Sequence, residues 1–257
     1  MPHRPHQPTR RSALLSLAAM PLALGADRAG AAAPLRLVAT EFPPYTSATL
    51  PGGGIASAIT RAALQRVGLP MELHFRPWVR ALSELQQGAW DGVIGAWHSP
   101  ERERYLLFPR PLGITNKIGF MARAGTDLPV GDLSRLGGLK IGTVRDYANP
   151  PAFELARLTR DEAVDDLGNL RKLLAGRVDL ALADKGVAFH LLQTLLQDAS
   201  RALVWLDPAV AEMPLHTALA GHRPHAHAQL AALNRGLAEL QASGELARML
   251  QSNARWY

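Results

Sequence analysis

The chain of 257 residues contains no cysteine, only four lysines among its 28 basic residues, and few aromatic residues (6%). The absence of cysteine excludes disulfides, thiolate zinc sites, iron–sulfur clusters and a cysteine nucleophile. Half of the formal net charge of +6 lies in the first 33 residues, which contain four arginines and one aspartate. The remaining positive charge is too small to indicate nucleic acid as a partner.

No apolar run is long enough to cross a membrane. The longest begins after Arg10-Arg11, reaches Leu24 and gives way to small residues through Ala33. A bilayer needs ~20 apolar residues, whereas a charged start, a short apolar stretch and a small-residue end are typical of an export signal. The arginine pair resembles a twin-arginine signal, and an ordinary basic segment is the alternative. We expect residues 1–33 to be a removable export signal and the mature protein to be periplasmic.

The rest of the chain alternates between strand-like and helix-like patterns. The composition, 47% hydrophobic and 19% charged, is that of a globular protein. The patterns predict strands at 35–40, 71–75, 92–96, 139–144 and 180–183, and helices at 55–67, 80–87, 151–158 and 226–240. This order predicts an α/β fold with parallel strands and crossover helices.

A short pattern occurs twice and predicts two similar lobes. Gly88-x-x-Asp91 and Gly176-x-x-Asp179 each follow a predicted helix and precede an apolar strand. We expect residues 34–117 together with 216–257 to form lobe 1, and residues 118–215 to form lobe 2. Because no flexible linker separates them, we expect strands near 115–121 and 213–219 to cross between the lobes.

Several motifs, in this order, resemble those of the family 3 bacterial extracellular solute-binding proteins, which serve polar amino-acid ABC importers. They are Phe42-Pro43-Pro44-Tyr45, Ser99-Pro100-Glu101-Arg102, Gly176-Arg177-Val178-Asp179 with Asp184, and Leu233-Asn234-Arg235-Gly236-Leu237. The resemblance implies a periplasmic binding protein-like fold, two α/β lobes that close by a hinge on a ligand in the cleft between them. It also implies no catalysis, no cofactor, a monomer, and delivery of a small polar or carboxylate-bearing solute to a permease in the inner membrane.

The chain departs from that pattern at three places. Ala58 stands where amino-acid binders usually have Asp, and Trp97-His98 where a small hydroxyl residue is common. Asp146-Tyr147 replaces the usual Gly-Thr or Gly-Ser of the second lobe. These departures leave the ligand open, with an amino acid as the default.

Candidate ligand-binding residues follow the predicted strands, because ligands of such sheets collect at the carboxyl ends of the strands. Phe42 and Tyr45 follow the first strand and could form an aromatic wall, or could only pack their loop. Trp78 and Arg80 follow the strand at 71–75 and could offer an indole face and a cation. Arg80 could equally lie on a solvated helix face.

Arg102 is the strongest candidate, since a guanidinium can bind a carboxylate through two hydrogen bonds. The resemblance assigns it the carboxylate of the ligand, although it could belong to a solvated turn with Glu103 and Arg104. Asp184 matches the family's partner for an α-amino group, with capping of the next helix as the alternative. Trp97 and Tyr147 occupy the positions of ligand residues but have unusual identities.

The sequence lacks the motifs of common enzymes and metal sites. It has no Gly-rich phosphate loop, nucleophile elbow or His-Glu-x-x-His pair, and His222, His225 and His227 have no carboxylate nearby in the sequence. We therefore expect no enzyme and no metal. Two alternatives remain: an exported dehydratase of the cyclohexadienyl (prephenate) type on the same fold, and a binding-protein-like partner of a periplasmic oxidoreductase.

Overall fold

The structure, a computed structural model, describes residues 1–3 and 33–252, so the predicted export signal lies almost wholly outside the described residues. The chain divides into two units, residues 1–31 and 32–257, and every strand and helix below belongs to the second. The strands are β1 (Leu35–Ala39), β2 (Met71–Phe75), β3 (Gly92–Trp97), β4 (Leu106–Leu107), β5 (Thr115–Arg123), β6 (Lys140–Val144), β7 (Thr159–Ala163), β8 (Leu180–Asp184) and β9 (Leu203–Ala220). The helices are α1 (Ile55–Arg66), α2 (Trp78–Gln86), α3 (Pro151–Ala156), α4 (Asp166–Leu174), α5 (Lys185–Thr194), α6 (Ala226–Ala242) and α7 (Glu245–Gln251).

The strands form two groups with the same internal order. β1 pairs in parallel with β2 on one side and β3 on the other. In the second group β6 pairs in parallel with β7 and β8 in the same way. The two predicted lobes therefore share one α/β topology, although the strand β7, whose sequence Thr-Arg-Asp-Glu-Ala is mostly polar, was not predicted.

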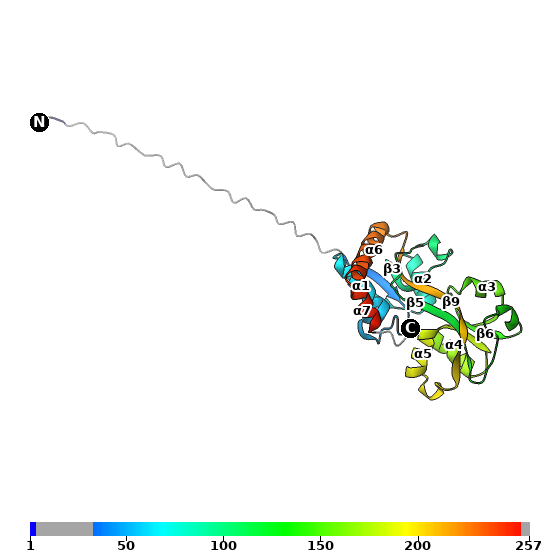
Figure 1. Cartoon of the computed structure of the whole chain (residues 1–257). Helices are drawn as coiled ribbons and strands as arrows, with labels where there is room; N and C mark the ends of the chain where they lie inside the picture. Colours follow the sequence, from blue (N-terminus) through cyan, green and yellow to red (C-terminus); the bar gives the residue numbers. More distant parts are fainter. Residues whose placement is uncertain (4–32, 253–257) are drawn as a thin grey trace. The chain divides into compact units, whose positions relative to one another are not determined.

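Two long strands connect the groups, as the sequence predicted. β9 pairs antiparallel with β3 near its carboxyl end and with β5 over most of the rest of its length, with a register shift that leaves residues 207–210 without a partner in β5. β5 in turn pairs antiparallel with β8. Figure 1 shows β5 and β9 side by side between the helices of the first group and those of the second. The lobes are thus joined by two strands that are paired by backbone hydrogen bonds, and the boundaries predicted for the lobes stay a prediction.

Each group of strands is covered by apolar helix faces. In the first group, α1 buries Ile59 and Leu64 against the sheet and packs on α6. In the second, Phe120 of β5 and Phe153 of α3 are fully buried, with their ring centres 6.2 Å apart. Burial of a large apolar side chain contributes roughly 1.5–3 kcal/mol, so these layers fix the strand ends that carry the site.

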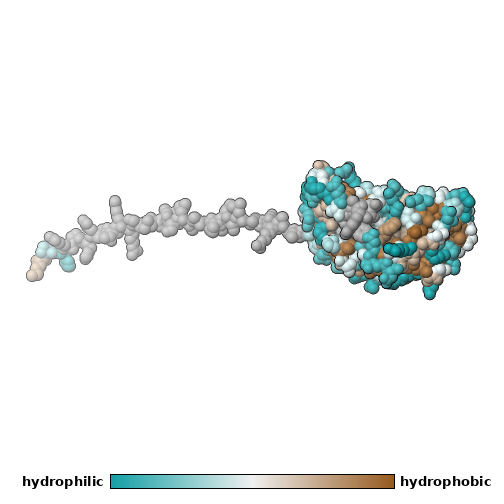
Figure 2. Space-filling view, turned by 60° about the horizontal axis from the view of Figure 1, so that its bottom comes forward, coloured by the Kyte–Doolittle hydropathy of each residue, from teal (hydrophilic) through white to brown (hydrophobic). Residues whose placement is uncertain are grey.

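Over the described residues, no helix is long and apolar enough to cross a membrane. Large apolar side chains with high exposure are scattered, Leu155, Val164 and Leu195 among them. Figure 2 shows hydrophilic and hydrophobic surface intermixed over one face of the molecule.

The repeated Gly-x-x-Asp pattern has a structural role. The Asp91 carboxylate accepts a hydrogen bond from the backbone N–H of Arg36 at 2.9 Å, and the Asp179 carboxylate accepts one from Lys140 N–H at 2.8 Å. In both lobes the aspartate therefore joins the start of the central strand to the turn that leads into its neighbour. Asp91 also binds the side chain of Arg223, 2.9 Å away, just before α6.

Replacing Asp91 by Ala is expected to lower the free energy of unfolding by about 1.5–3 kcal/mol, because a mostly buried charged acceptor with two donors is lost. Asp179→Ala is the matched control. Its side chain is 43% exposed, against 14% for Asp91, so its loss should cost less than about 1 kcal/mol. Urea denaturation of both variants measures the difference, and equal losses would contradict this account.

Candidate functional site

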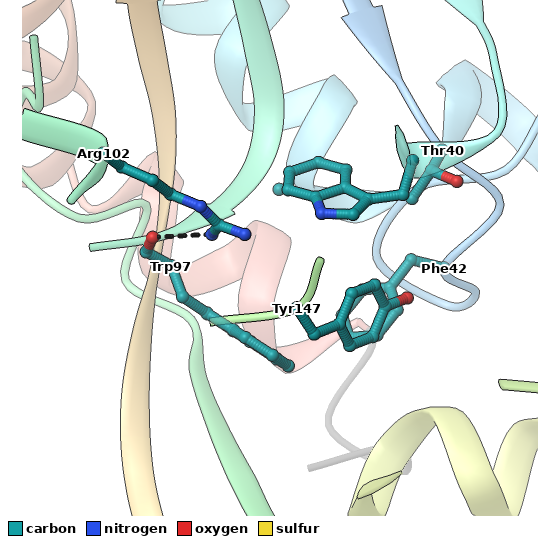
Figure 3. Close-up of a pocket in the computed structure, with 7 residues that line it drawn as sticks. Thr40, Phe42, Trp97, Arg102 and Tyr147 are labelled. Carbon is teal, nitrogen blue, oxygen red and sulfur yellow. Dashed lines mark hydrogen bonds between the residues drawn. The ribbon is translucent and has the colours of Figure 1, made fainter. Parts of the chain in front are cut away.

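Arg102 lies buried at the start of a short 3-10 turn, Arg102–Arg104, with only 5% of its surface exposed. Its Nη1 donates to the carbonyl oxygen of Trp97 at 2.9 Å (Figure 3). Its Nη2 donates to the carbonyl oxygen of Asp146 at 2.8 Å. Glu103 and Arg104, by contrast, are exposed. The turn thus separates one buried guanidinium from two solvated charges.

Aromatic side chains surround this guanidinium. The Arg102 Cζ lies 5.0 Å from the centre of the Trp78 ring, close enough for a cation–π interaction. Phe42 and Trp97 continue the wall, with ring centres 5.8 Å apart. Burial lowers the pKa of Arg102, but an arginine stays charged at any relevant pH. Among the described residues, no carboxylate forms an ion pair with it.

The turn after β6, in the second group of strands, enters this aromatic wall. The ring centre of Tyr147 lies 6.0 Å from that of Phe42, 6.2 Å from that of Trp78 and 5.4 Å from that of Trp97. All three contacts are nearly perpendicular, the favoured edge-to-face geometry. Asp146 has a left-handed φ of 60°, which Asp tolerates better than most residues and which turns the chain toward Arg102.

The Asp146 carbonyl oxygen also accepts a hydrogen bond from Trp78 Nε1 at 3.0 Å. Two donors of the first group therefore converge on one oxygen of the second. The pocket is lined by Thr40, Phe42, Trp78, Gly95, Trp97, Arg102 and Tyr147, and the centre of a water molecule can move within only about 10 Å³ of it. That space suits little more than one water molecule, so the two lobes are in direct contact here.

A buried carboxyl group lies behind Tyr147. The Tyr147 hydroxyl donates to Asp166 Oδ2 at 2.8 Å, and Asp166 is 4% exposed. Asp166 Oδ1 has no hydrogen-bond partner among the described residues. The pKa of Asp166 is raised to about 7, because burial and the nearby Asp184 outweigh the opposing effect of the Tyr147 hydrogen bond. Burial, together with Asp166, raises the pKa of Tyr147 well above its ordinary value.

Asp184 and Tyr45 lie beside this pocket without lining it. Asp184 accepts a hydrogen bond from the backbone N–H of Val187 at 2.8 Å and caps α5, which is the structural alternative considered above. Burial raises its pKa to about 6, while hydrogen bonds from Val187, the Tyr45 hydroxyl and the Asn116 side chain lower it. Trp97 Nε1 donates to Asn116 Oδ1 at 2.8 Å, which links the pocket to the crossing strand β5.

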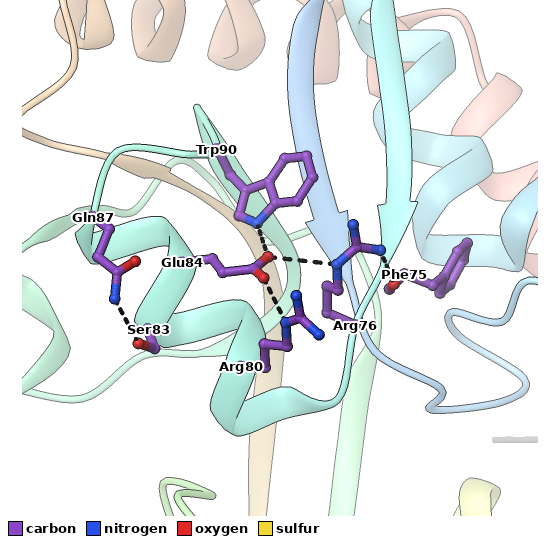
Figure 4. Close-up of polar contacts among 7 residues, drawn as sticks. All are labelled: Phe75, Arg76, Arg80, Ser83, Glu84, Gln87 and Trp90. Atoms are coloured by element: carbon purple, nitrogen blue, oxygen red, sulfur yellow. Dashed lines mark hydrogen bonds and ion pairs between the residues drawn. The ribbon is translucent and has the colours of Figure 1, made fainter.

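Arg80 does not reach the pocket. Its side chain is 66% exposed and its Nε donates to Glu84 Oε1 at 2.6 Å, one turn further along α2. Glu84 also accepts from Trp90 Nε1 at 3.0 Å and lies 3.5 Å from Arg76 Nε (Figure 4). This is the solvated helix face considered above, and a ligand role for Arg80 stays a prediction.

Of the predicted site residues, the structure thus brings together five around one pocket: Arg102, Trp78, Trp97, Phe42 and Tyr147. Sequence reasoning missed Thr40, Gly95 and Asp166. Thr40 was predicted as the last residue of the first strand and directly follows β1 in the structure, so its place at the strand's carboxyl end was a usable signal. Asp166 follows β7, whose charged sequence does not look like a strand, and it therefore had no predicted strand end to mark it.

Solved structures with this fold are binding domains of several kinds. A histidine kinase sensor domain with similarity to periplasmic binding proteins matches with a TM-score of 0.74 and 22% identity, over 87% of this chain and 95% of that one. The GluR0 ligand-binding core from Nostoc punctiforme, in complex with L-glutamate, matches with a TM-score of 0.71 and 16% identity, over 87% of this chain and 99% of that one. The ancestral amino-acid-binding protein AncCDT-1, a precursor of cyclohexadienyl dehydratase, matches with a TM-score of 0.69 and 17% identity, over 87% of this chain and 95% of that one. At these identities the likeness establishes the fold alone.

The structure therefore has the two-lobed α/β architecture of the periplasmic binding proteins. Residues 37–255 match the bacterial extracellular solute-binding proteins, family 3. The chain belongs to this family, as its motifs predicted. None of the curated proteins compared with it matches its sequence.

Asp166→Asn is expected to stabilise the protein above neutral pH. The buried carboxyl keeps its proton up to a pH of about 7 in the folded state, whereas an unfolded aspartate loses it near ~3.9. The unfolded state therefore binds fewer protons between these values, and the stability of the wild type falls as pH rises through this window. Asn cannot ionise, yet its carbonyl oxygen can still accept from Tyr147.

The free energy of unfolding from urea denaturation, at a pH of about 4.5 and about 8, measures this effect. Between the lower and the higher pH, the free energy of unfolding of the variant should rise relative to that of the wild type. The expected rise is about 1.4 kcal/mol for each unit by which the pKa is raised. An equal difference between the two proteins at both pH values would contradict the assignment.

Proposed function

We propose that this protein is a periplasmic binding component that captures a small carboxylate-bearing solute between its lobes and delivers it to an ABC transporter. The observation that carries the proposal is the buried Arg102 guanidinium. Among the described residues its acceptors are two carbonyl oxygens, and it lies where the two lobes meet. A buried cation without a counter-ion is costly, and a ligand carboxylate would lower that cost.

The aromatic residues around Arg102 complete the site. Trp78, Trp97 and Phe42 offer apolar faces to the remainder of the solute, and the Trp78 indole N–H offers a second donor beside the guanidinium. A few polar groups in an apolar cleft are the usual composition of a small-molecule site. Closure needs only that the solute contact both lobes and so favour the closed state.

Lobe boundaries at residues 117–118 and 215–216 fit this proposal, because both fall within the crossing strands. Export through residues 1–33 and removal of that segment would place the mature protein in the periplasm. A monomer is sufficient for the task, since each chain carries residues of both lobes at the pocket.

Mass spectrometry of small molecules released from freshly purified protein tests the proposal. The released solute should carry a carboxylate, raise the melting temperature of the emptied protein by mass action, and remain chemically unchanged after incubation. Turnover of prephenate to phenylpyruvate by the pure protein would instead establish the dehydratase alternative. A cleft that binds no released or added solute, together with tight binding to an oxidoreductase, would establish the partner-protein alternative.

Arg102→Ala is expected to weaken binding of that solute at least tenfold, because a hydrogen bond to a charged group contributes roughly 1.5–3 kcal/mol. Arg102→Lys should restore affinity only in part, since a point charge cannot replace the planar fork.

Arg104→Ala is the control, because this neighbouring arginine is exposed and should change affinity little. Calorimetric titration compares the three variants, with the melting temperature of each checked first. Equal, small losses for the two alanine variants would remove Arg102 from the ligand site.

A further inference from the structure

The pocket around Arg102 receives an oxygen, a ring and a hydroxyl from the protein itself. The oxygen is the Asp146 carbonyl, which accepts from Arg102 Nη2 and Trp78 Nε1. The ring is that of Tyr147, and its hydroxyl donates to Asp166. These are the contacts that a bound solute would make with a pocket of this composition.

We propose that the Asp146–Tyr147 turn acts as an internal occupant of the cleft, which a solute has to displace before it can bind. This inference rests on the proposed function, because it concerns the same pocket. The centre of a water molecule can move within only about 10 Å³ of the pocket, so a solute has no room beside the Tyr147 ring. The occupant and the solute therefore compete for Arg102, for Trp78 and for the aromatic walls.

The covalent structure of the turn indicates the class of solute. The backbone N, Cα and Cβ of Tyr147 separate the Asp146 carbonyl carbon from the phenol ring. A flexible aromatic carboxylate with a ring hydroxyl, such as γ-(p-hydroxyphenyl)butyrate, has the same spacing. Its carboxylate would take the place of the carbonyl at Arg102 with a full negative charge, and its hydroxyl would donate to Asp166 as Tyr147 does.

The occupant also joins the lobes. Arg102, Trp78 and the aromatic walls belong to the first group of elements, whereas Asp146 and Tyr147 follow β6 of the second. Every contact of the turn with the pocket therefore favours the closed arrangement. Removal of the ring should shift the equilibrium toward separated lobes in the absence of any solute.

Distance measurement between two spin labels tests this step without a solute. The chain has no cysteine, so Gln86→Cys on α2 and Leu155→Cys on α3, both exposed, give one labelled site in each lobe. In protein freed of small molecules, the wild type and Tyr147→Phe should give one short distance, and Tyr147→Ala a longer, broader distribution. Added phenol, the part of the side chain that alanine lacks, should restore the short distance in Tyr147→Ala. Identical distributions for the wild type and Tyr147→Ala would overturn the proposal.

Calorimetric titration with γ-(p-hydroxyphenyl)butyrate tests the competition. The apparent affinity of a site equals its intrinsic affinity multiplied by the fraction of molecules in which the site is free. If Tyr147 occupies the pocket in about nine of ten molecules or more, Tyr147→Ala should bind the probe about tenfold more tightly than the wild type, or better. γ-Phenylbutyrate, which lacks the hydroxyl, should bind Tyr147→Ala more weakly than the probe does.

Equal or weaker binding of the probe by Tyr147→Ala would make Tyr147 a contact of the ligand and overturn the role of occupant. Failure of the proposed function would be recognised separately, through the absence of a released solute, while the label distances still report on the turn.

Discussion

A buried guanidinium has to be surrounded by oxygen atoms, and the cleft of this protein is arranged around that requirement. Arg102 is held within aromatic walls, so its acceptors have to come from backbone carbonyls or from a ligand. One carbonyl, that of Trp97, belongs to the strand that leads into the Arg102 turn. The other, that of Asp146, comes from the opposite lobe, so the guanidinium has this second acceptor only where the two lobes are in contact.

The pocket is connected to the strands between the lobes by a short series of polar contacts. Trp97, at the end of β3, donates to Asn116 at the start of β5. The Asn116 side chain lies against Asp184, the last residue of β8 and the cap of α5. Because β5 and β9 both run from one group of strands to the other, opening of the cleft in the proposed function would bend these two strands rather than a loose linker.

The sequence predicted those features that depend on local pattern. Most strands of both groups and the crossing segments follow from periodicity and spacing, and the choice of Arg102 as a site candidate follows from the family motifs. The strand β7 was not predicted because its mostly polar residues show no alternation of apolar and polar positions. Asp166 was missed for the same reason, since no predicted strand end preceded it. The place of Tyr147 could not be predicted either. It depends on contacts between residues about one hundred positions apart, which become visible only when both lobes are folded.

The proposed internal occupant changes which states of the cleft a partner protein can distinguish. A permease or a sensor that responds only to lobe closure would not distinguish a cleft closed by Tyr147 from one closed by a solute. A partner that distinguishes them has to contact the turn itself, where Asp146 is exposed. Displacement of the turn, rather than closure alone, would then carry the information that a solute is bound.

The same competition lowers the apparent affinity, so the cleft would respond only to solute concentrations high enough to displace the phenol. Asp146 and Tyr147 would in this way set the threshold of the site from within the chain itself.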